Sequence, residues 1–153
     1  MVAVSMLLFL SHVSGAIGCI PTIQTTTAAP VCCPVITTNN PPRVRPVTGS
    51  VGANLDQCSV FRRFTRGNCP SEAILVCSRA PGTTVSQVVL ELVDGTNIVA
   101  TSTGATQAII IITCSATGVW QFVNANGVGL PFTGAVCSQG TLTSGDYVYD
   151  VQP

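Results

Sequence analysis

The stretch Ala108-Ile109-Ile110-Ile111-Ile112-Thr113-Cys114 contains five successive β-branched residues. Such residues favour strands, because their branched side chains pack well on a pleated surface. A short, continuous apolar run is typical of a strand that is buried on both faces. The run therefore predicts a central strand of an all-β protein.

Shorter apolar runs separated by turn signals flank this stretch. Residues 72–77 precede Pro81-Gly82, and residues 85–93 end at Asp94-Gly95, a dipeptide typical of hairpin turns. The further expected strands are 96–103, 119–123 and 128–137, the last one interrupted at Pro131. Turn signals at intervals of about ten residues are typical of sandwiches and barrels. We therefore predict a small disulfide-stabilised β-sandwich of the immunoglobulin-like or Greek-key type.

The start of the chain has the features of a secretory signal. Residues 1–18 contain a short apolar stretch followed by small residues, with cleavage expected after Gly15 or Gly18. The stretch is too short to span a bilayer. The only histidine, His12, lies within this segment, and the chain contains no lysine. We therefore expect a secreted, extracellular protein without a membrane anchor.

The chain contains 8 cysteines: Cys19, Cys32, Cys33, Cys58, Cys69, Cys77, Cys114 and Cys137. An even number of cysteines behind a secretory signal predicts disulfides, which persist in oxidising compartments. Zinc is disfavoured, since no Cys-x-x-Cys pair exists and no histidine remains after processing. Their spacing alone cannot choose among the possible pairings.

Composition limits the other classes of function. Charged residues make up 8% of the chain and the net charge is +0, so neither a nucleic acid nor an anionic membrane is an expected partner. Residues 19–57 are rich in threonine and proline and predict a disordered linker that carries Cys19, Cys32 and Cys33. The candidate O-glycosylation sites in this linker are Thr25, Thr26, Thr27, Thr37 and Thr38. Residues 58–138 would form the β domain, and residues 139–153 a C-terminal tail.

Several of these elements together resemble a known family. They are a threonine-rich run, the paired cysteines in residues 29–34, Gly67-Asn68-Cys69, residues 74–77, the stretch from Ile112 to Trp120 and Gly134-Ala135-Val136-Cys137. This pattern resembles the six-cysteine domain of nematode secreted and surface proteins, a family presumed extracellular and of unknown function. The resemblance covers roughly residues 31–138, and its most specific part is Thr-Cys-x-x-x-Gly-x-Trp. It implies a non-catalytic extracellular domain.

The resemblance also implies roles for individual cysteines. The six family cysteines would be Cys32, Cys33, Cys69, Cys77, Cys114 and Cys137. The first and third of them are partners in that family, which suggests a bond between Cys32 and Cys69. Cys32 and Cys33 are adjacent here, whereas the family usually separates its first two cysteines, so either could fill the first role. Cys19 and Cys58 are additional and could pair with each other.

Two other architectures share parts of the pattern. Cys-x-x-x-Gly-x-Trp before a final cysteine also resembles the end of a complement-control (sushi) module, although the stretch from Trp120 to Cys137 is long for it. An immunoglobulin-like sandwich would place Cys77 and Cys114 on facing strands as a bridge between the sheets. Its tryptophan would lie between the two cysteines, whereas Trp120 follows the second.

The residue types present argue against catalysis. Without histidine or lysine after processing, the chain lacks the usual general base and the usual Schiff-base nucleophile. Glu91 and Asp94 flank a predicted turn, where solvated carboxylates are normal, and Asp146 and Asp150 lie in the tail. We expect no enzyme activity, no metal and no cofactor.

One local cluster of charge could serve recognition. Arg62, Arg63 and Arg66 alternate with Phe61 and Phe64, and could form a patch for an anionic glycan or an acidic protein. The simpler interpretation is a solvated strand edge with both phenylalanines pointing inward. Trp120 is expected to fill the core, and would serve as a ligand platform only if exposed. The sequence thus predicts an extracellular structural or interaction domain; the alternative is a module that recognises a glycan or a protein.

Overall fold

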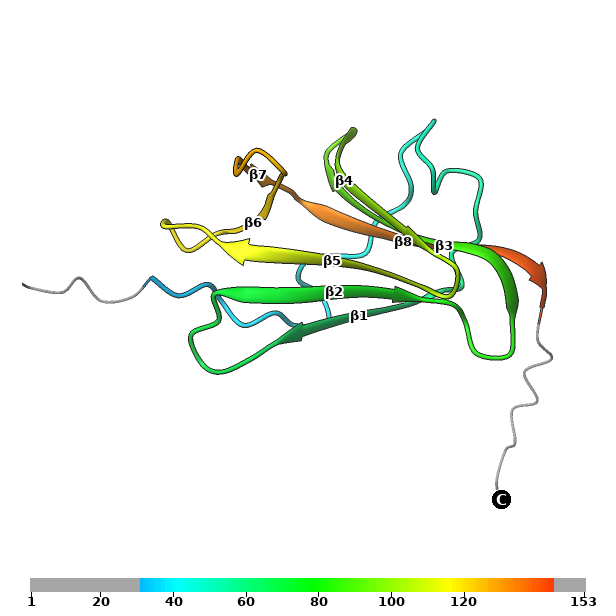
Figure 1. Ribbon diagram of the computed structural model, residues 1–153, viewed down its shortest axis with the longest axis horizontal. Coiled ribbons are helices and arrows are strands. Elements are labelled where there is room, and N and C mark those ends of the chain that lie inside the picture. The colour runs from blue at the N-terminus through cyan, green and yellow to red at the C-terminus, as the bar shows by residue number, and fades with distance from the viewer. Residues whose placement is uncertain (1–30, 145–153) are drawn as a thin grey trace, which may run out of the picture.

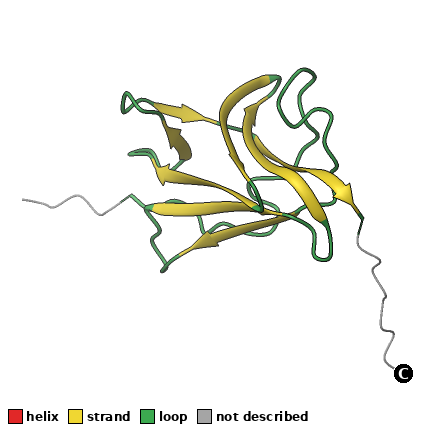
Figure 2. Cartoon of the chain, turned by 45° about the vertical axis from the view of Figure 1, so that its right-hand side comes forward, coloured by secondary structure: helices red, strands yellow, loops and turns green. Residues whose placement is uncertain are grey.

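The computed structural model describes residues 31–144, which form two antiparallel sheets packed face to face (Figure 1). The strands are β1 (Val60–Thr65), β2 (Glu72–Ser78), β3 (Thr84–Asp94), β4 (Asn97–Gly104), β5 (Gln107–Cys114), β6 (Trp120–Val123), β7 (Gly129–Pro131) and β8 (Gly134–Thr143). One sheet has the order β1-β2-β5-β6-β7, and the other has the order β4-β3-β8. Figure 2 shows that every regular element in this part of the chain is a strand. The predicted all-β sandwich is confirmed.

The isoleucine run forms β5 and is a central strand, but it is not buried on both faces. Ile110 and Ile112 lie in the core between the sheets, whereas Ile109 is 48% exposed and Ile111 is 54% exposed. Alternation sends successive side chains to opposite faces of a strand, and no part of the described chain covers the outer face at these two residues. The predicted burial on both faces is therefore wrong for this strand.

β3 is covered on both faces at residues 88–93, as β8 is at residues 134–139. Val88, Leu90 and Leu92 point into the core, and the residues between them are buried as well. A backbone segment that precedes β1 lies over this second face: a Cβ built on Gly52 would lie 2.9 Å from a carboxylate oxygen of Glu91. β3 continues through the predicted turn at Asp94-Gly95 into β4, where Gly95 has a φ of 59°. The hairpin is confirmed.

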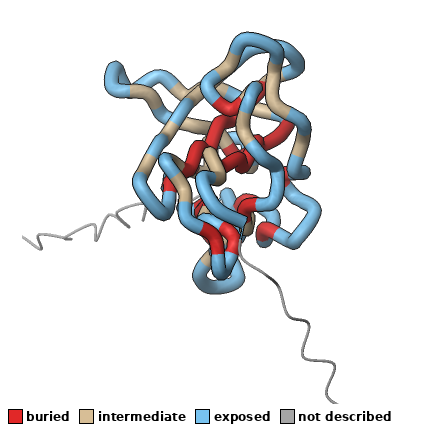
Figure 3. Tube along the Cα trace, turned by 90° about the vertical axis from the view of Figure 1, so that its right-hand side faces the viewer, coloured by how far each residue is buried: buried red, intermediate tan, exposed pale blue. Residues whose placement is uncertain are grey.

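The described part of the predicted linker 19–57, which is residues 31–57, is not a separate linker. Cys33 and Ile36 belong to the hydrophobic core, with 2% and 9% exposure. Figure 3 shows that the buried parts of the chain lie mainly inside the domain. Backbone bonds join Pro42 and Val44 to Ala135 of β8, each with an N···O distance of 2.9 Å. The prolines predicted an extended chain correctly, but extended backbone also fits the open edge of a sheet. The segment uses that edge instead of remaining separate.

The C-terminal boundary also differs from the expected one. β8 continues to Thr143, and Gln139 is fully buried, so the domain extends past residue 138. The Gln139 amide accepts a hydrogen bond from the Ala80 backbone nitrogen at 2.6 Å and donates one to Thr141 at 2.8 Å. It thereby fixes the connection between β2 and β3. The remainder of the predicted tail, from residue 145, lies outside the described residues, as does the predicted signal segment.

Three disulfides link these layers. Cys77 of β2 is bonded to Cys137 of β8 and joins the two sheets. Cys32 is bonded to Cys69, which is the pairing that the family resemblance implies, and Cys33 is bonded to Cys114 at the end of β5. The bridge between Cys77 and Cys114 that an immunoglobulin-like arrangement suggested is therefore wrong. Two of the three bonds instead attach the segment before β1 to the five-stranded sheet.

Candidate functional site

The structure separates the residues of the predicted ligand patch. β1 sends Arg62 and Phe64 to the outer face of its sheet and Phe61 and Arg63 to the opposite face. Phe61 packs against the core, while Phe64 remains 49% exposed, so the expectation that both phenylalanines point inward is wrong for Phe64. Arg66 follows the strand and is exposed. The three arginines therefore do not form one surface.

Trp120 is a core residue and therefore does not belong to the candidate ligand patch. Its side chain is 7% exposed and belongs to the same hydrophobic cluster as Cys33. The indole nitrogen donates a hydrogen bond of 3.0 Å to the Pro34 carbonyl oxygen. A buried indole needs such a partner. Trp120 thus holds the N-terminal segment on the sandwich and presents no platform for a ligand.

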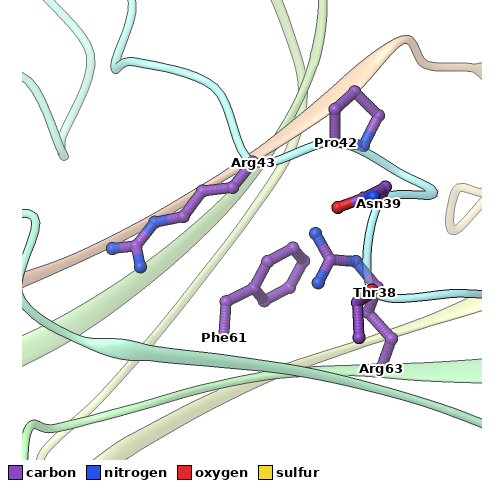
Figure 4. A pocket seen from close by; sticks show the side chains of 6 residues that line it. All are labelled: Thr38, Asn39, Pro42, Arg43, Phe61 and Arg63. Atoms are coloured by element: carbon purple, nitrogen blue, oxygen red, sulfur yellow. The ribbon is translucent and has the colours of Figure 1, made fainter.

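The arrangement best suited to hold a ligand is a shallow hollow between residues 38–43 and β1 (Figure 4). Its volume is about 470 Å³, and its lining residues are Thr38, Asn39, Pro42, Arg43, Phe61 and Arg63. The lining contains two guanidinium groups and no carboxylate. Such a set of donors suits an anion. Thr38 and Thr37, two of the predicted O-glycosylation sites, are exposed beside it; the other three lie outside the described residues.

Arg63 reaches into this hollow from β1. Its Nε and Nη2 donate hydrogen bonds of 2.8 and 2.6 Å to the Pro41 carbonyl oxygen. The guanidinium carbon lies 4.1 Å from the centroid of the Phe61 ring, as Figure 4 illustrates. Burial lowers the pKa of Arg63, and the nearby positive charge of Arg43 lowers it further. Within the described part of the chain, Nη1 has no acceptor, so this nitrogen remains available to a ligand.

Arg43 is mainly a structural clip at the edge of β8. Its guanidinium donates hydrogen bonds to the carbonyl oxygens of Gln57, Ser59 and Cys137, at 2.6, 2.8 and 2.6 Å. These bonds add to the backbone bridge between Asp56 and Gln139, which joins the same two segments. Burial lowers the pKa of Arg43. Sequence reasoning did not single out this residue. The alternation in Pro42-Arg43-Val44-Arg45 was the available signal, because it is typical of an edge strand.

The carboxylates do not form a catalytic pair. Glu91, expected to be solvated, is fully buried and accepts hydrogen bonds from the Ser50 hydroxyl at 2.8 Å and the Val51 backbone nitrogen at 3.1 Å. A carboxylate enclosed in this way cannot reach a substrate, so its role is to hold the loop at residues 50–52. Asp94 lies at the hairpin turn as predicted, while Asp146 and Asp150 fall outside the described residues.

Cys58 is the one cysteine with a free thiol among the residues that the structure describes, and it is exposed. It lies two residues before β1, and its sulfur is 3.9 Å from the Thr141 hydroxyl oxygen. Cys19, its predicted partner, lies outside the described residues.

Comparison with known proteins finds no matching family model, no matching curated protein and no matching solved structure. Within residues 31–144, no three side chains of the metal-binding types are grouped so that they could hold an ion. The same residues include no helix with the length and apolarity needed to cross a bilayer. The assignment to the nematode six-cysteine family and the sushi-like alternative stay predictions.

Proposed function

We propose that this chain is a secreted, non-catalytic extracellular domain with a structural or interaction role. The observation that carries the proposal is the set of three disulfides, which attach the N-terminal segment to the sandwich and the two sheets to each other. Disulfides persist in oxidising compartments and are rare in the cytosol. The signal-like residues 1–18 support the same location.

The residue chemistry supports a non-catalytic role. The described chain holds its one fully buried carboxylate, Glu91, in a closed hydrogen-bonded site. Two further polar side chains are fully buried: Ser138 accepts a hydrogen bond from the Gln57 side-chain amide, and Gln139 accepts one from the Ala80 backbone nitrogen. Residues 31–144 contain no histidine or lysine that could act as a base for a hydroxyl nucleophile. These groups stabilise a scaffold, and none is arranged to act on a substrate.

Secretion of the full chain from a eukaryotic cell line tests this proposal. We expect the protein in the medium, with its N-terminus at residue 16 or 19 and with six or more cysteines oxidised. Retention in the cytosol with reduced thiols would contradict the proposal. Hydrolysis of a glycan or peptide substrate that is lost in Glu91→Gln or Asp94→Asn would contradict its non-catalytic part.

A second candidate function is recognition of an anionic glycan or an acidic protein, and one observation favours it. The hollow in Figure 4 contains Arg43 and Arg63 with no carboxylate in its lining. The positive charge of Arg43 lies close enough to Arg63 to lower its pKa. An anion placed between the two guanidinium groups would offset their repulsion. The Phe61 ring supplies an apolar floor for a sugar or an aliphatic side chain.

Binding of a sulfated glycan, with the unsulfated glycan as reference, tests this candidate. We expect Arg63→Gln to weaken binding about tenfold or more, since a hydrogen bond to a charged group contributes about 1.5–3 kcal/mol. Arg63→Lys should retain part of the affinity. Arg62→Gln is the matched control, because Arg62 lies on the opposite face of the same strand. Equal losses in the variants at 62 and 63, or no preference for sulfate, would exclude the hollow as the site.

A further inference from the structure

The outer face of the five-stranded sheet carries apolar side chains that the described chain leaves uncovered. Figure 1 shows β1, β2 and β5 side by side in this sheet. The cross-strand register places Phe64 beside Ile74 and Ile74 beside Ile111, and Ile109 lies on the same face of β5. These four residues, the outer apolar face, are 49%, 38%, 54% and 48% exposed, in the order named. Contiguous apolar patches of this kind mark interaction surfaces.

Two opposite charges lie at the two ends of the outer apolar face. Arg62 of β1 pairs with Val76 of β2, and Val76 pairs in turn with Ile109. At the other end, Glu72 of β2 pairs with Thr113. Residues two apart along a strand point to the same face, so both charged side chains lie on the same face as the apolar ones. Glu72 and Val76 are four residues apart on β2, which separates the two ends by about 13 Å.

Neither charge has a partner within the described chain. Arg62 and Glu72 are exposed, and neither side chain makes an ion pair or a hydrogen bond among residues 31–144. Arg66, which lines a groove of about 550 Å³ together with Glu72, is not paired with that carboxylate either. The apolar side chains lie between Arg62 and Glu72 and keep them apart within one copy. The face therefore suits a partner that offers apolar surface together with both signs of charge.

A second copy of the same face meets these requirements under one symmetry. A two-fold axis that runs across the strands, level with Ile74 and Ile111, stacks two such faces about 10 Å apart. The rotation keeps each strand over its counterpart and reverses its direction, so Glu72 of one copy lies over Val76 of the other. Arg62 of that second copy lies beside this position, one strand spacing of about 4.8 Å away. Each copy thus supplies one carboxylate and one guanidinium to two equivalent ion pairs.

The charges disfavour the other simple orientation. A two-fold axis parallel to the strands would reverse the order of the strands and place β1 over β6. Arg62 and Glu72 would then stay at opposite ends of the stacked faces, with no counter-charge over either one. The placement of the two charges therefore selects the axis across the strands.

We propose that the outer apolar face joins two copies of this chain in a two-fold dimer, with ion pairs between Arg62 of each copy and Glu72 of the other. The dimer stacks the two five-stranded sheets face to face, as in an aligned sandwich. β1, β2 and β5 have 6, 7 and 8 residues, of which every second one faces outward. Standard interfaces contain about 20–30 residues a side, so this smaller dimer exchanges with the monomer and its population rises with concentration.

Sedimentation velocity of the secreted full chain, from low micromolar concentration to roughly 1 mM, tests the dimer. We expect the sedimentation coefficient to rise with concentration toward that of a dimer, while non-reducing gel electrophoresis shows only a monomer band. Ile111→Glu should abolish the rise. Ile98→Glu is the matched control and should leave the rise unchanged, because Ile98 is 40% exposed on β4 of the other sheet. Fluorescence of Trp120, the only tryptophan, verifies the fold of each variant.

Charge reversal tests the orientation of the two copies. Arg62→Glu and Glu72→Arg each place like charges together twice per dimer, and each should weaken dimerisation about tenfold or more. The double variant restores two pairs of opposite charge and should return the dissociation constant to within about threefold of the original. Arg45→Glu reverses an exposed arginine outside this face and should change nothing.

The same measurements can overturn the proposal. A monomer at every concentration overturns it, whether the face is then open or covered by another part of the chain. A dimer that survives Ile111→Glu, or one that is covalent in the non-reducing gel, overturns it as well. Failure of the double charge reversal to restore dimerisation also overturns it, because the ion pairs fix the orientation.

Discussion

Removal of the bond between Cys33 and Cys114 tests whether the N-terminal segment belongs to the folded unit. The bond spans a sequence separation of 81 residues, but the other two disulfides shorten the loop that it closes to roughly 30 residues, which constrains the unfolded chain by about 3.7 kcal/mol. Cys33 is also 2% exposed, so replacing its sulfur adds a loss of burial and packing of roughly 1 kcal/mol. We therefore expect Cys33→Ala combined with Cys114→Ala to lower the free energy of unfolding by about 5 kcal/mol.

Guanidinium chloride unfolding measures this loss. Trp120 is the only tryptophan and is buried, so its fluorescence reports on the core. With a denaturant dependence of about 3 kcal/mol per molar, the unfolding midpoint should fall by roughly 1.5 M. The matched control removes the bond between Cys32 and Cys69, which are both exposed and 37 residues apart. With the other two bonds intact, this bond closes a loop of about the same length, so we expect a loss of about 3.7 kcal/mol without the added cost of burial at Cys33.

A loss below about 1 kcal/mol for the first pair would refute the reasoning. Residues 31–57 would then lie outside the cooperative unit, and their contacts with the sandwich would contribute nothing to its stability. Far-UV circular dichroism should give the same midpoint as the fluorescence, because both report one two-state transition.

Three further substitutions test individual contacts. Glu91→Ala should destabilise the fold by about 2–4 kcal/mol, since it removes both hydrogen bonds to the loop at Ser50 and leaves a cavity. Glu91→Gln can keep both contacts and should cost less than half as much. Equal losses of stability for the two variants in thermal unfolding would argue against the loop contact. Trp120→Phe leaves the Pro34 carbonyl without its donor and should cost about 1–3 kcal/mol in chemical denaturation, whereas an unchanged midpoint would show that the indole hydrogen bond is unimportant. Arg43→Lys should lower the free energy of unfolding by about 1–3 kcal/mol, because one ammonium group cannot reach the three carbonyls that the guanidinium spans. Amide hydrogen exchange at the β8 edge should become faster, and an unchanged exchange rate there would contradict the role of Arg43 as a clip.

Local patterns predicted most of the strands, although β1 was not among the strands expected from the sequence, and the single strand expected at residues 128–137 is two strands, β7 and β8. The β-branched runs and the Asp94-Gly95 turn gave the positions of β3, β4 and β5 closely. What they could not give was which face of each strand is covered. β3 is buried on both sides because a segment from far earlier in the chain lies over it, whereas the isoleucines of β5 alternate between core and solvent. Both strands are apolar runs in the sequence, so periodicity alone could not show which of them is covered on both faces.

The roles of the polar residues depended on long-range contacts and could not be read from spacing. Arg63 and Arg62 are neighbours in sequence, yet one binds the Pro41 carbonyl and the other lies on the outer face. Glu91 lies three residues before a turn, where solvated charge is normal, but the loop at residues 50–52 encloses it. The threonine- and proline-rich composition of residues 31–57 predicted extended backbone correctly and gave no sign that two disulfides hold it in place.

The disulfide map of the secreted protein tests most directly the claim that this chain is an extracellular scaffold whose N-terminal segment is part of the sandwich. Cys69 and Cys77 share one tryptic peptide, and Cys114 and Cys137 share another, so cleavage after Glu72 and a chymotryptic cleavage after Trp120 or Phe122 are needed to separate them. Fragmentation between the adjacent Cys32 and Cys33 then assigns their two partners. We predict Cys32 with Cys69, Cys33 with Cys114, and Cys77 with Cys137. Free thiols at these six positions, or a bond between Cys77 and Cys114, would contradict the account.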